Sequence, residues 1–381
     1  MSGRFVRSVC TAAVVATAAF ALPAPMAFAS PKAPPDAPVS ELLTQLQTLY
    51  QKAEEATEKY NGTEEKLKKQ RARVDKLDSE LADVRVALAN SKNDAGRLAR
   101  EQYRGGTGAL SPYVRFLLSR DPQEALDQGH QLKREAGRRA AMIERLTGGE
   151  QQADQLATDA LAALDVQETL AATQKKQRDT VKQRLDEVEQ MLASLTGDQL
   201  AELQRLEQKD IGAAQDKLLA SGSLGGSSRA PSKDGEAAVA YAFKQLGKPY
   251  VWGATGPDSF DCSGLTSQAW AHAGDPIPRT SQEQWKSLPR VPLNELRPGD
   301  LVVYFKGATH VAMYIGDGLV VQAPRPGAKV KVSPIAANPL LGAVRPDQGK
   351  EPVKGYKPPK LPAGAANGSD TGYGSAGAPK R

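Results

Sequence analysis

The sequence predicts two folds in succession, a long all-α coiled-coil region followed by a small α+β domain. A heptad pattern of apolar residues begins near residue 39 and predicts the first. Short Val-, Tyr- and Phe-rich runs punctuated by Gly, Pro and Asp begin beyond residue 235 and predict the second. Among the 381 residues only 5% are aromatic while 25% are charged, which fits a long helical region built on Leu and Ala.

The coiled-coil region is expected over residues 39–215. Apolar or small residues recur there at alternating spacings of four and three, and charged residues and Gln dominate the positions between them. The first run is Leu42, Leu46, Leu49, Ala53, Ala56, Tyr60, Thr63, Leu67, Val74, Leu77, Leu81, Val84, Leu88, Ala95 and Leu98, and the later run is Val181, Leu185, Val188, Leu192 and Leu195. Such a run is too long for a helix of a globular core.

A break separates the two runs of the seam. Gly105-Gly106-Thr107-Gly108 interrupts the first helix, a short apolar insert follows, and Asp121-Pro122 form a cap and first-turn pair for the next helix. Gly148-Gly149 predicts a kink further along. Two amphipathic stretches joined by a compact tip predict an antiparallel helical hairpin within one chain, and a coiled coil between two chains fits the same spacing.

Residues 1–29 are expected to be an export signal that is removed. Arg4 and Arg7 precede an apolar stretch that is too short and Ala-rich to span a membrane stably. Ala27-Phe28-Ala29 is a small-residue cleavage motif, with Ser30 as the expected mature start. The mature protein is therefore expected outside the membrane.

The rest of the chain outside the two folds is expected to be irregular. Residues 216–235 read as a flexible Gly/Ser linker, and residues 347–381 as a disordered tail rich in Gly, Pro, Ser and Lys. The net charge of +6 would suggest nucleic acid for a cytosolic protein. Export argues against that class and favours anionic envelope polymers or lipid headgroups, and a solubilising excess charge explains the value equally well.

Cys262 is the candidate nucleophile. Cys10 leaves with the signal, so Cys262 is the one thiol of the mature chain and no internal disulfide is possible. Asp258 or Asp261 can cap a helix that continues to Gly274, which puts the thiol near the helix N-terminus. That position favours the thiolate, the attacking species, and lowers a pKa that starts at about 8.5. The alternative is a buried cysteine that packs as a small hydrophobic residue.

His310 is the candidate base among three histidines. His130 falls in the helical region, and His272 lies ten residues along the helix from Cys262, roughly 15 Å away. His310 instead opens an expected strand that ends in a Gly-Asp-Gly hairpin turn.

Two further polar residues are expected beside this pair. The returning strand brings Gln322 approximately opposite His310, where its amide oxygen can accept the imidazole N–H and fix the ring. A polar side chain on an edge strand is the alternative. Tyr250 can direct its hydroxyl at a developing oxyanion, or it can simply pack in a strand.

Four strings resemble the NlpC family of bacterial cell-wall peptidases: YVWGATGPDSFDCSGLTSQAW, PRTSQEQW, LRPGDLVVYF and HVAMYIGDG. They occur in the family's order over residues 236–346. The resemblance implies a papain-like α+β fold, no cofactor, Cys262 as nucleophile and His310 as base. Tyr250 matches the Tyr that precedes the nucleophile. Gln322 falls where the family often has His, and this departure bears on the orientation and pKa of His310.

By the same resemblance the substrate is the stem peptide of peptidoglycan, often cut between D-glutamate and the diamino acid, and the protein is secreted and associated with the cell wall. The expected substrate-binding residues are Trp252, Asp261, Ser263 and Arg279, and Arg279 fits either a structural ion pair or a carboxylate clamp. An acyltransferase or amidase of this fold and a non-catalytic wall-binding scaffold are the alternatives. One thiol and three scattered histidines, without HExxH or CxxC, predict no metal site.

The helical region, with its YRGG tip and the insert SPYVRFLLSRDPQEALD, is similar to coiled-coil modules of division-associated wall hydrolases of Gram-positive bacteria. That resemblance implies a membrane partner of the FtsEX type and a restraint on the peptidase. The full-length protein is therefore expected to be less active than a shortened chain that starts near Gly235.

Overall fold

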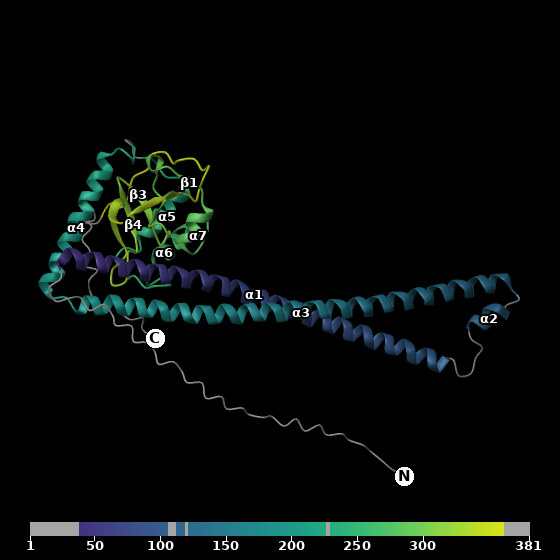
Figure 1. Ribbon diagram of the computed structural model, residues 1–381. Coiled ribbons are helices and arrows are strands. Elements are labelled where there is room, and N and C mark those ends of the chain that lie inside the picture. Colours follow the sequence, from purple (N-terminus) through teal and green to yellow (C-terminus); the bar gives the residue numbers. More distant parts are fainter. Residues whose placement is uncertain (1–37, 106–111, 119–120, 226–228, 362–381) are drawn as a thin grey trace, which may run out of the picture.

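The computed structural model describes residues 38–105, 112–118, 121–225 and 229–361. They form a long helical hairpin with a small α+β domain packed against its base (Figure 1). The expected export signal, residues 1–29, lies outside the described residues. None of the helices in the described part of the chain combines the length and apolar composition that a membrane span needs.

The hairpin consists of α1 (Val39–Gly105) and α3 (Pro122–Ala193), with α2 (Pro112–Leu118) at its tip. The two long helices lie side by side and antiparallel within one chain, which confirms the predicted helical hairpin (Figure 1). Seam positions such as Val74 and Leu81 are buried. The kink expected at Gly148-Gly149 was a wrong prediction, because α3 continues through both glycines and packing against α1 compensates for their low helix propensity.

At its base the hairpin is joined to α4 (Gly197–Ala220), which begins at a capping box of Thr196 and Gln199. Buried residues of all three helices meet there: Leu42, Leu43, Leu46, Leu49, Tyr50, Val188, Met191 and Leu203. The linker expected from residue 216 starts too early, because α4 continues to Ala220 and its Leu218 packs on the sheet of the α+β domain.

The α+β domain contains α5 (Lys233–Phe243), α6 (Cys262–His272), α7 (Ser281–Ser287) and a six-stranded sheet. The strands are β1 (Arg290–Val291), β2 (Leu301–Tyr304), β3 (His310–Gly316), β4 (Leu319–Gln322), β5 (Lys331–Pro334) and β6 (Leu340–Val344). Their order is β1-β6-β2-β3-β4-β5, and every neighbouring pair is antiparallel. This arrangement confirms the predicted α+β class.

Both faces of the sheet are covered. Alternate strand residues such as Val303 and Val321 form one core with α5 and α6, while Tyr304 and Val320 face the opposite side, where Leu218 and Leu224 pack. Because neither face meets water, the central strands are continuously apolar instead of alternating.

The start of the expected tail is ordered. Asp347 is buried and accepts hydrogen bonds from Ser232 and Arg297, and the main chain of Val353 bonds to Pro231. The prediction of disorder from residue 347 was therefore wrong for this segment, because its carboxylate completes a buried polar network. Residues 362–381 lie outside the described part.

Candidate active site

Cys262 is the first residue of α6. Asp261 caps that helix, as its side chain accepts a hydrogen bond from the amide of Gly264 at 2.6 Å. Of the two caps that the sequence allowed, Asp261 is the one used. Gly264 is required because a Cβ there would collide with the carbonyl oxygen of Ala254.

His310 is the first residue of β3, the strand against which α6 packs. Its Nε2 lies 2.7 Å from Oε1 of Gln322, at the end of β4. The register pairs Met313 with Val321, so Gln322 reaches His310 diagonally along the ladder. The interaction expected from the sequence is present, and a carbonyl acceptor on Nε2 leaves Nδ1 as the proton-accepting atom.

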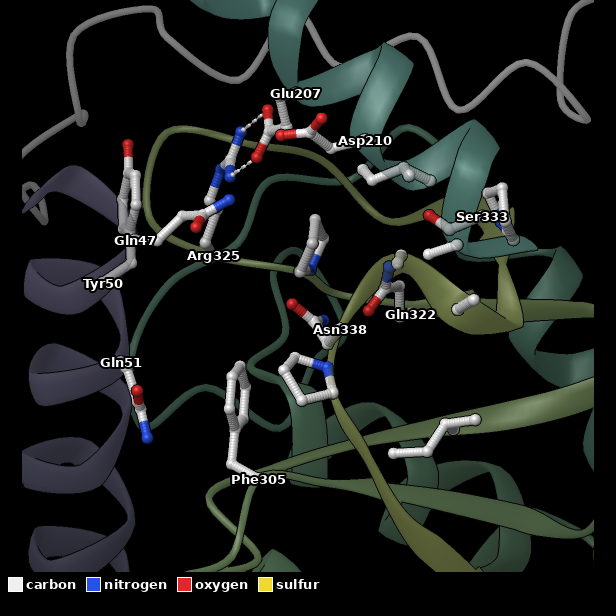
Figure 2. Close-up of a pocket in the computed structure, with 18 of the residues that line it drawn as sticks. Gln47, Tyr50, Gln51, Glu207, Asp210, Phe305, Gln322, Arg325, Ser333 and Asn338 are labelled. Atoms are coloured by element: carbon white, nitrogen blue, oxygen red, sulfur yellow. Dashed lines mark hydrogen bonds and ion pairs between the residues drawn. The ribbon is translucent and has the colours of Figure 1, made fainter. Parts of the chain in front are cut away.

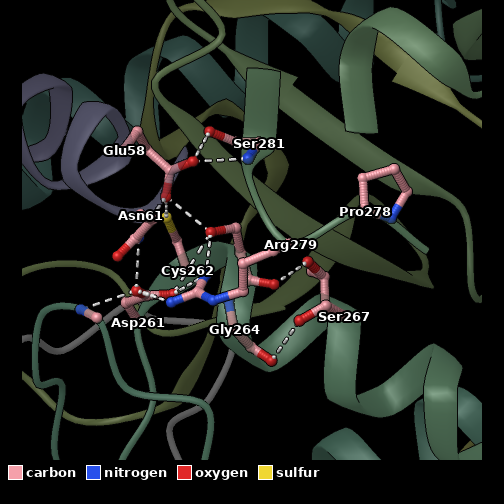
Figure 3. A network of polar contacts seen from close by, with 12 residues as sticks. Glu58, Asn61, Asp261, Cys262, Gly264, Ser267, Pro278, Arg279 and Ser281 are labelled. Carbon is pink, nitrogen blue, oxygen red and sulfur yellow. Dashed lines mark hydrogen bonds and ion pairs between the residues drawn. The ribbon is translucent and has the colours of Figure 1, made fainter. Parts of the chain in front are cut away.

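A network of polar side chains surrounds the start of α6 (Figure 3). Arg279 donates to both oxygens of Asp261, at 3.0 and 2.6 Å, and to Oγ of Ser263 at 2.8 Å. Asp261 also accepts from the amide of Gly253, next to Trp252. Arg279 is therefore part of a buried, bidentate ion pair.

Helix α1 lies across this network through Glu58, a residue that the sequence did not single out. Its Oε1 accepts from Ser263 Oγ at 2.7 Å and lies 3.9 Å from Sγ of Cys262. Its Oε2 accepts from the amide of Ser281 at 2.7 Å and lies 2.8 Å from the hydroxyl of that residue. Burial, followed by the charge of Asp261, raises the pKa of Glu58 to about 7.

Three neighbours of Glu58 on α1 contact the domain as well. Oε1 of Glu54 lies 3.3 Å from Nδ1 of His310, and Asn61 donates to Asp261 at 3.0 Å. The ring of Tyr60 packs edge-on against Trp252 with 5.1 Å between centroids. The expected site residues that contact α1 are therefore Cys262, Ser263, His310, Asp261 and Trp252.

The pKa of the Cys262 thiol is shifted in the opposite direction to the one predicted from the sequence. Burial, followed by the charges of Glu58, Asp261 and Glu54, raises the pKa of the thiol well above its ordinary value, whereas a position at a helix N-terminus predicted a lowered one. The predicted direction of the shift was wrong because burial and the carboxylates of Glu58, Asp261 and Glu54 outweigh the helix N-terminus.

The histidine and the tyrosine respond to the same charges. Burial by itself lowers the pKa of His310, but the charge and hydrogen bond of Glu54, together with Gln322, raise it above its usual value. Tyr250 is buried, and burial followed by the nearby Cys262 raises its pKa well above the usual range.

Among the described residues, Glu58, Asp261 and Cys262 bring one ligand atom each within 4.8 Å of one another. Both oxygens of Asp261 already accept from the guanidinium of Arg279, and both oxygens of Glu58 have hydroxyl or amide partners. A cation placed there would compete with Arg279, so the cluster is better explained as a hydrogen-bonded network.

The sequence analysis missed Glu54, Glu58, Asn61 and Ser281. The seam of the coiled coil changes where the first three occur, but this change does not indicate what covers them. Where they occur, the seam consists of Ala53, Ala56, Tyr60 and Thr63 instead of leucines, and the polar residues recur at helical spacings of four and three.

Residues 247–342 match the model of the NlpC/P60 family. A probable endopeptidase of Corynebacterium glutamicum is 44% identical over 111 residues, which cover 29% of this chain and 53% of that protein. A probable endopeptidase of Mycobacterium tuberculosis is 40% identical over 113 residues, or 29% of each chain. The crystal structure of the NlpC/p60 domain of the peptidoglycan hydrolase SagA is 34% identical and covers 29% of this chain and 97% of that one, with a TM-score of 0.28. The chain spans about half the length of the corynebacterial relative.

Proposed function

Because the C-terminal domain of this chain is an NlpC/P60 domain, we propose that the protein is an exported cysteine peptidase that hydrolyses peptidoglycan stem peptides. The proposed nucleophile is Cys262 and the proposed base is His310. The name of the SagA domain, a peptidoglycan hydrolase, and the names of the two probable endopeptidases support this substrate class and reaction.

The observation that carries the proposal is the position of the two reactive atoms around one short stretch of α1. Sγ of Cys262 lies 3.9 Å from Glu58, and Nδ1 of His310 lies 3.3 Å from Glu54. Glu54 and Glu58 are one helical turn apart, or roughly 6 Å. The thiol and the imidazole therefore both face the same stretch of α1, which supports their assignment as a nucleophile and its base.

The geometry supports a two-step mechanism. The Cys262 thiolate attacks the carbonyl carbon of the scissile amide, and His310 protonates the leaving amine. The backbone amide of Cys262 and the hydroxyl of Tyr250 stabilise the oxyanion. Water then hydrolyses the thioester, with His310 now acting as base. Gln322 keeps the proton on Nε2, so that Nδ1 is the nitrogen that can exchange a proton with the thiol and the leaving amine.

The proposed bond is the one between D-glutamate and the diamino acid. Asp261, Ser263, Arg279 and Trp252 flank Cys262 and are proposed to bind the stem peptide on one side of that bond. We also propose that residues 1–29 direct export to the cell wall, that the hairpin restrains the peptidase, and that an FtsEX-type membrane protein acts on the hairpin.

A digest of defined muropeptides tests the reaction. The core between the sheet, α5 and α6 is drawn only from residues 238–344, and on the other face of the sheet Leu218 and Leu224 are only partly buried, so a chain of residues 229–361 is a suitable enzyme. We expect it to release fragments cut after D-glutamate, identified by mass, and Cys262→Ala to lose at least about a thousandfold in rate because the nucleophile is gone. Equal activity of the variant would contradict the mechanism. An acylated product in place of a free acid would favour the acyltransferase alternative.

A further inference from the structure

We infer that Glu58 is an internal ligand of the active site: α1 inactivates the domain by binding this carboxyl group beside Cys262, with Glu54 against His310 as a second contact. The inference rests on the proposed peptidase function and specifies how the hairpin regulates it.

The carboxyl group of Glu58 is bound and not merely covered. Both of its oxygens have partners in the α+β domain: Oγ of Ser263, the amide of Ser281 and the hydroxyl of Ser281 (Figure 3). Within α1, only the longer hydrogen bond from Asn61, at 3.4 Å, reaches this carboxyl group among the contacts that the structure describes. A buried carboxyl group is costly unless such partners are in place. Glu58 is 2% exposed, so the domain supplies what water would otherwise provide.

The binding surface of α1 is a single stripe. Glu54, Glu58 and Asn61 follow at spacings of four and three, so a straight helix presents all three on one face. They contact the start of β3, the start of α6 and the cap residue of α6, respectively.

This stripe blocks the reaction in two ways. A peptide cannot place its carbonyl carbon against Sγ while Oε1 of Glu58 lies 3.9 Å from it. The carboxyl groups of Glu54 and Glu58 also oppose ionisation of the thiol, which must lose its proton to attack. Departure of α1 therefore removes both the obstruction and the negative charges.

The test uses the full chain and the rate at which iodoacetamide alkylates Cys262, a readout that requires no peptidase activity. Glu58→Ala removes the bound group without harm to the helix, because Ala has the highest helix propensity. The matched control is Glu55→Ala, the neighbouring exposed residue, which pairs only with Lys59 on its own helix among the contacts that the structure describes. We expect alkylation about tenfold faster or more for Glu58→Ala and within twofold of wild type for Glu55→Ala.

A second variant makes the test independent of the first. Asn61→Asp places a carboxylate against Asp261, and the repulsion should also expose Cys262 while circular dichroism retains the helical signal. Equal alkylation rates for Glu58→Ala, Asn61→Asp and the control would overturn the inference. Failure of the proposed function is a different result: the thiol becomes reactive in the variants, yet residues 229–361 release no muropeptide fragments.

Discussion

At the scale of single residues, three titratable groups meet where α1 contacts the domain, and all three favour their protonated forms there. The pKa of Glu58 is raised from 4.5 to about 7, the pKa of His310 is raised above its usual value, and that of Cys262 lies well above its own. The hydroxyl of Ser281 has one hydrogen but two close oxygens, Glu58 Oε2 and the carbonyl of Ala308 at 2.7 Å. A proton on Glu58 makes both contacts hydrogen bonds.

Binding of α1 should therefore weaken as the pH rises. A pKa raised on binding stabilises the bound state fully below the free value, here 4.5, and the stabilisation is lost as the pH rises to about 7. For Glu58 this interval corresponds to at most about 3 kcal/mol. Protonation of His310 also favours the bound state of α1, because the protonated ring pairs with Glu54. Ionisation of Cys262 favours release of α1.

The measurement is the alkylation rate of Cys262 in the full chain divided by the rate in residues 229–361. The ratio cancels the ordinary increase of the alkylation rate with pH, which comes from ionisation of the thiol. We expect the ratio to rise from pH 5 to pH 8, and to rise less in Glu58→Gln, which cannot titrate. A ratio that is constant over this range in the wild-type chain would exclude proton-linked binding.

The positions of Cys262 and His310 at the starts of a helix and a strand could be predicted because the signals are local. Asp261 and Gly264 fix a helix start at Cys262, and a tight hairpin sets Gln322 against His310. The protonation state was not predictable, because Glu58 reaches the thiol from a residue 204 positions away along the chain. No local pattern indicates which face of a coiled coil a distant domain will cover.

At the scale of elements, Arg325 joins three parts of the fold at a distance from Cys262. It lies in the loop between β4 and β5, donates to both oxygens of Glu207 on α4 at 2.7 and 3.0 Å, and stacks 4.8 Å from the ring of Tyr50 on α1 (Figure 2). Beside it is a cavity of about 770 Å³ that α1, α4 and the sheet line together, with Glu54 and Gln322 among the lining residues.

Arg325→Gln should loosen α1 without a change in the catalytic groups. The variant removes both hydrogen bonds from Arg325 to the largely buried carboxylate of Glu207, and release of α4 and α1 relieves this loss by returning the carboxylate to water. We expect Cys262 in the full chain to be alkylated several-fold faster. The control is Arg205→Gln, an exposed residue of α4 that pairs with Glu202 one turn away, which should leave the rate unchanged. Identical alkylation rates for Arg325→Gln and Arg205→Gln would show that the ion pair between Arg325 and Glu207 does not help to hold α1 against the domain.

Two segments show where a prediction from amino-acid composition alone is wrong. Residues 216–220 were included in a Gly/Ser linker, yet they are good helix formers, and Leu218 has an apolar face of the sheet to cover. Asp347 stands at the start of a Gly- and Pro-rich stretch, yet Arg297 and Ser232 hold it. In both cases contacts with residues distant in the sequence determine the structure, and the local sequence does not reveal such contacts.

At the scale of the whole molecule, the hairpin and α4 enclose the domain from two sides. The contacts with α1 are mostly polar, whereas Leu218 of α4 and Leu224, just beyond that helix, pack on the sheet. The heptads predicted the hairpin from their apolar seam. They could not predict where the domain docks, because polar docking residues resemble the solvent-exposed positions of any coiled coil.

Removal of the hairpin and α4 should activate the peptidase. A chain that starts at Gly235 would lack Ser232, which caps α5 and bonds to Asp347, so the shortened chain is better begun at Arg229. We expect residues 229–361 to digest purified peptidoglycan at least about tenfold faster than the full chain, with turnover followed by release of soluble fragments. Similar turnover by the two proteins would eliminate restraint by the helical region.

Because α1 is one unbroken helix, a movement of its far end is transmitted to Glu58 near its base. The helix is anchored near Leu46 at its base, Glu58 lies about 18 Å along it, and the last residue, Gly105, lies about 88 Å along it. A swing of 10 Å at the far end thus moves Glu58 by about 2 Å, enough to break hydrogen bonds of 2.7 Å. By the same ratio, a sideways force at the tip acts about fivefold more strongly on the carboxyl group of Glu58.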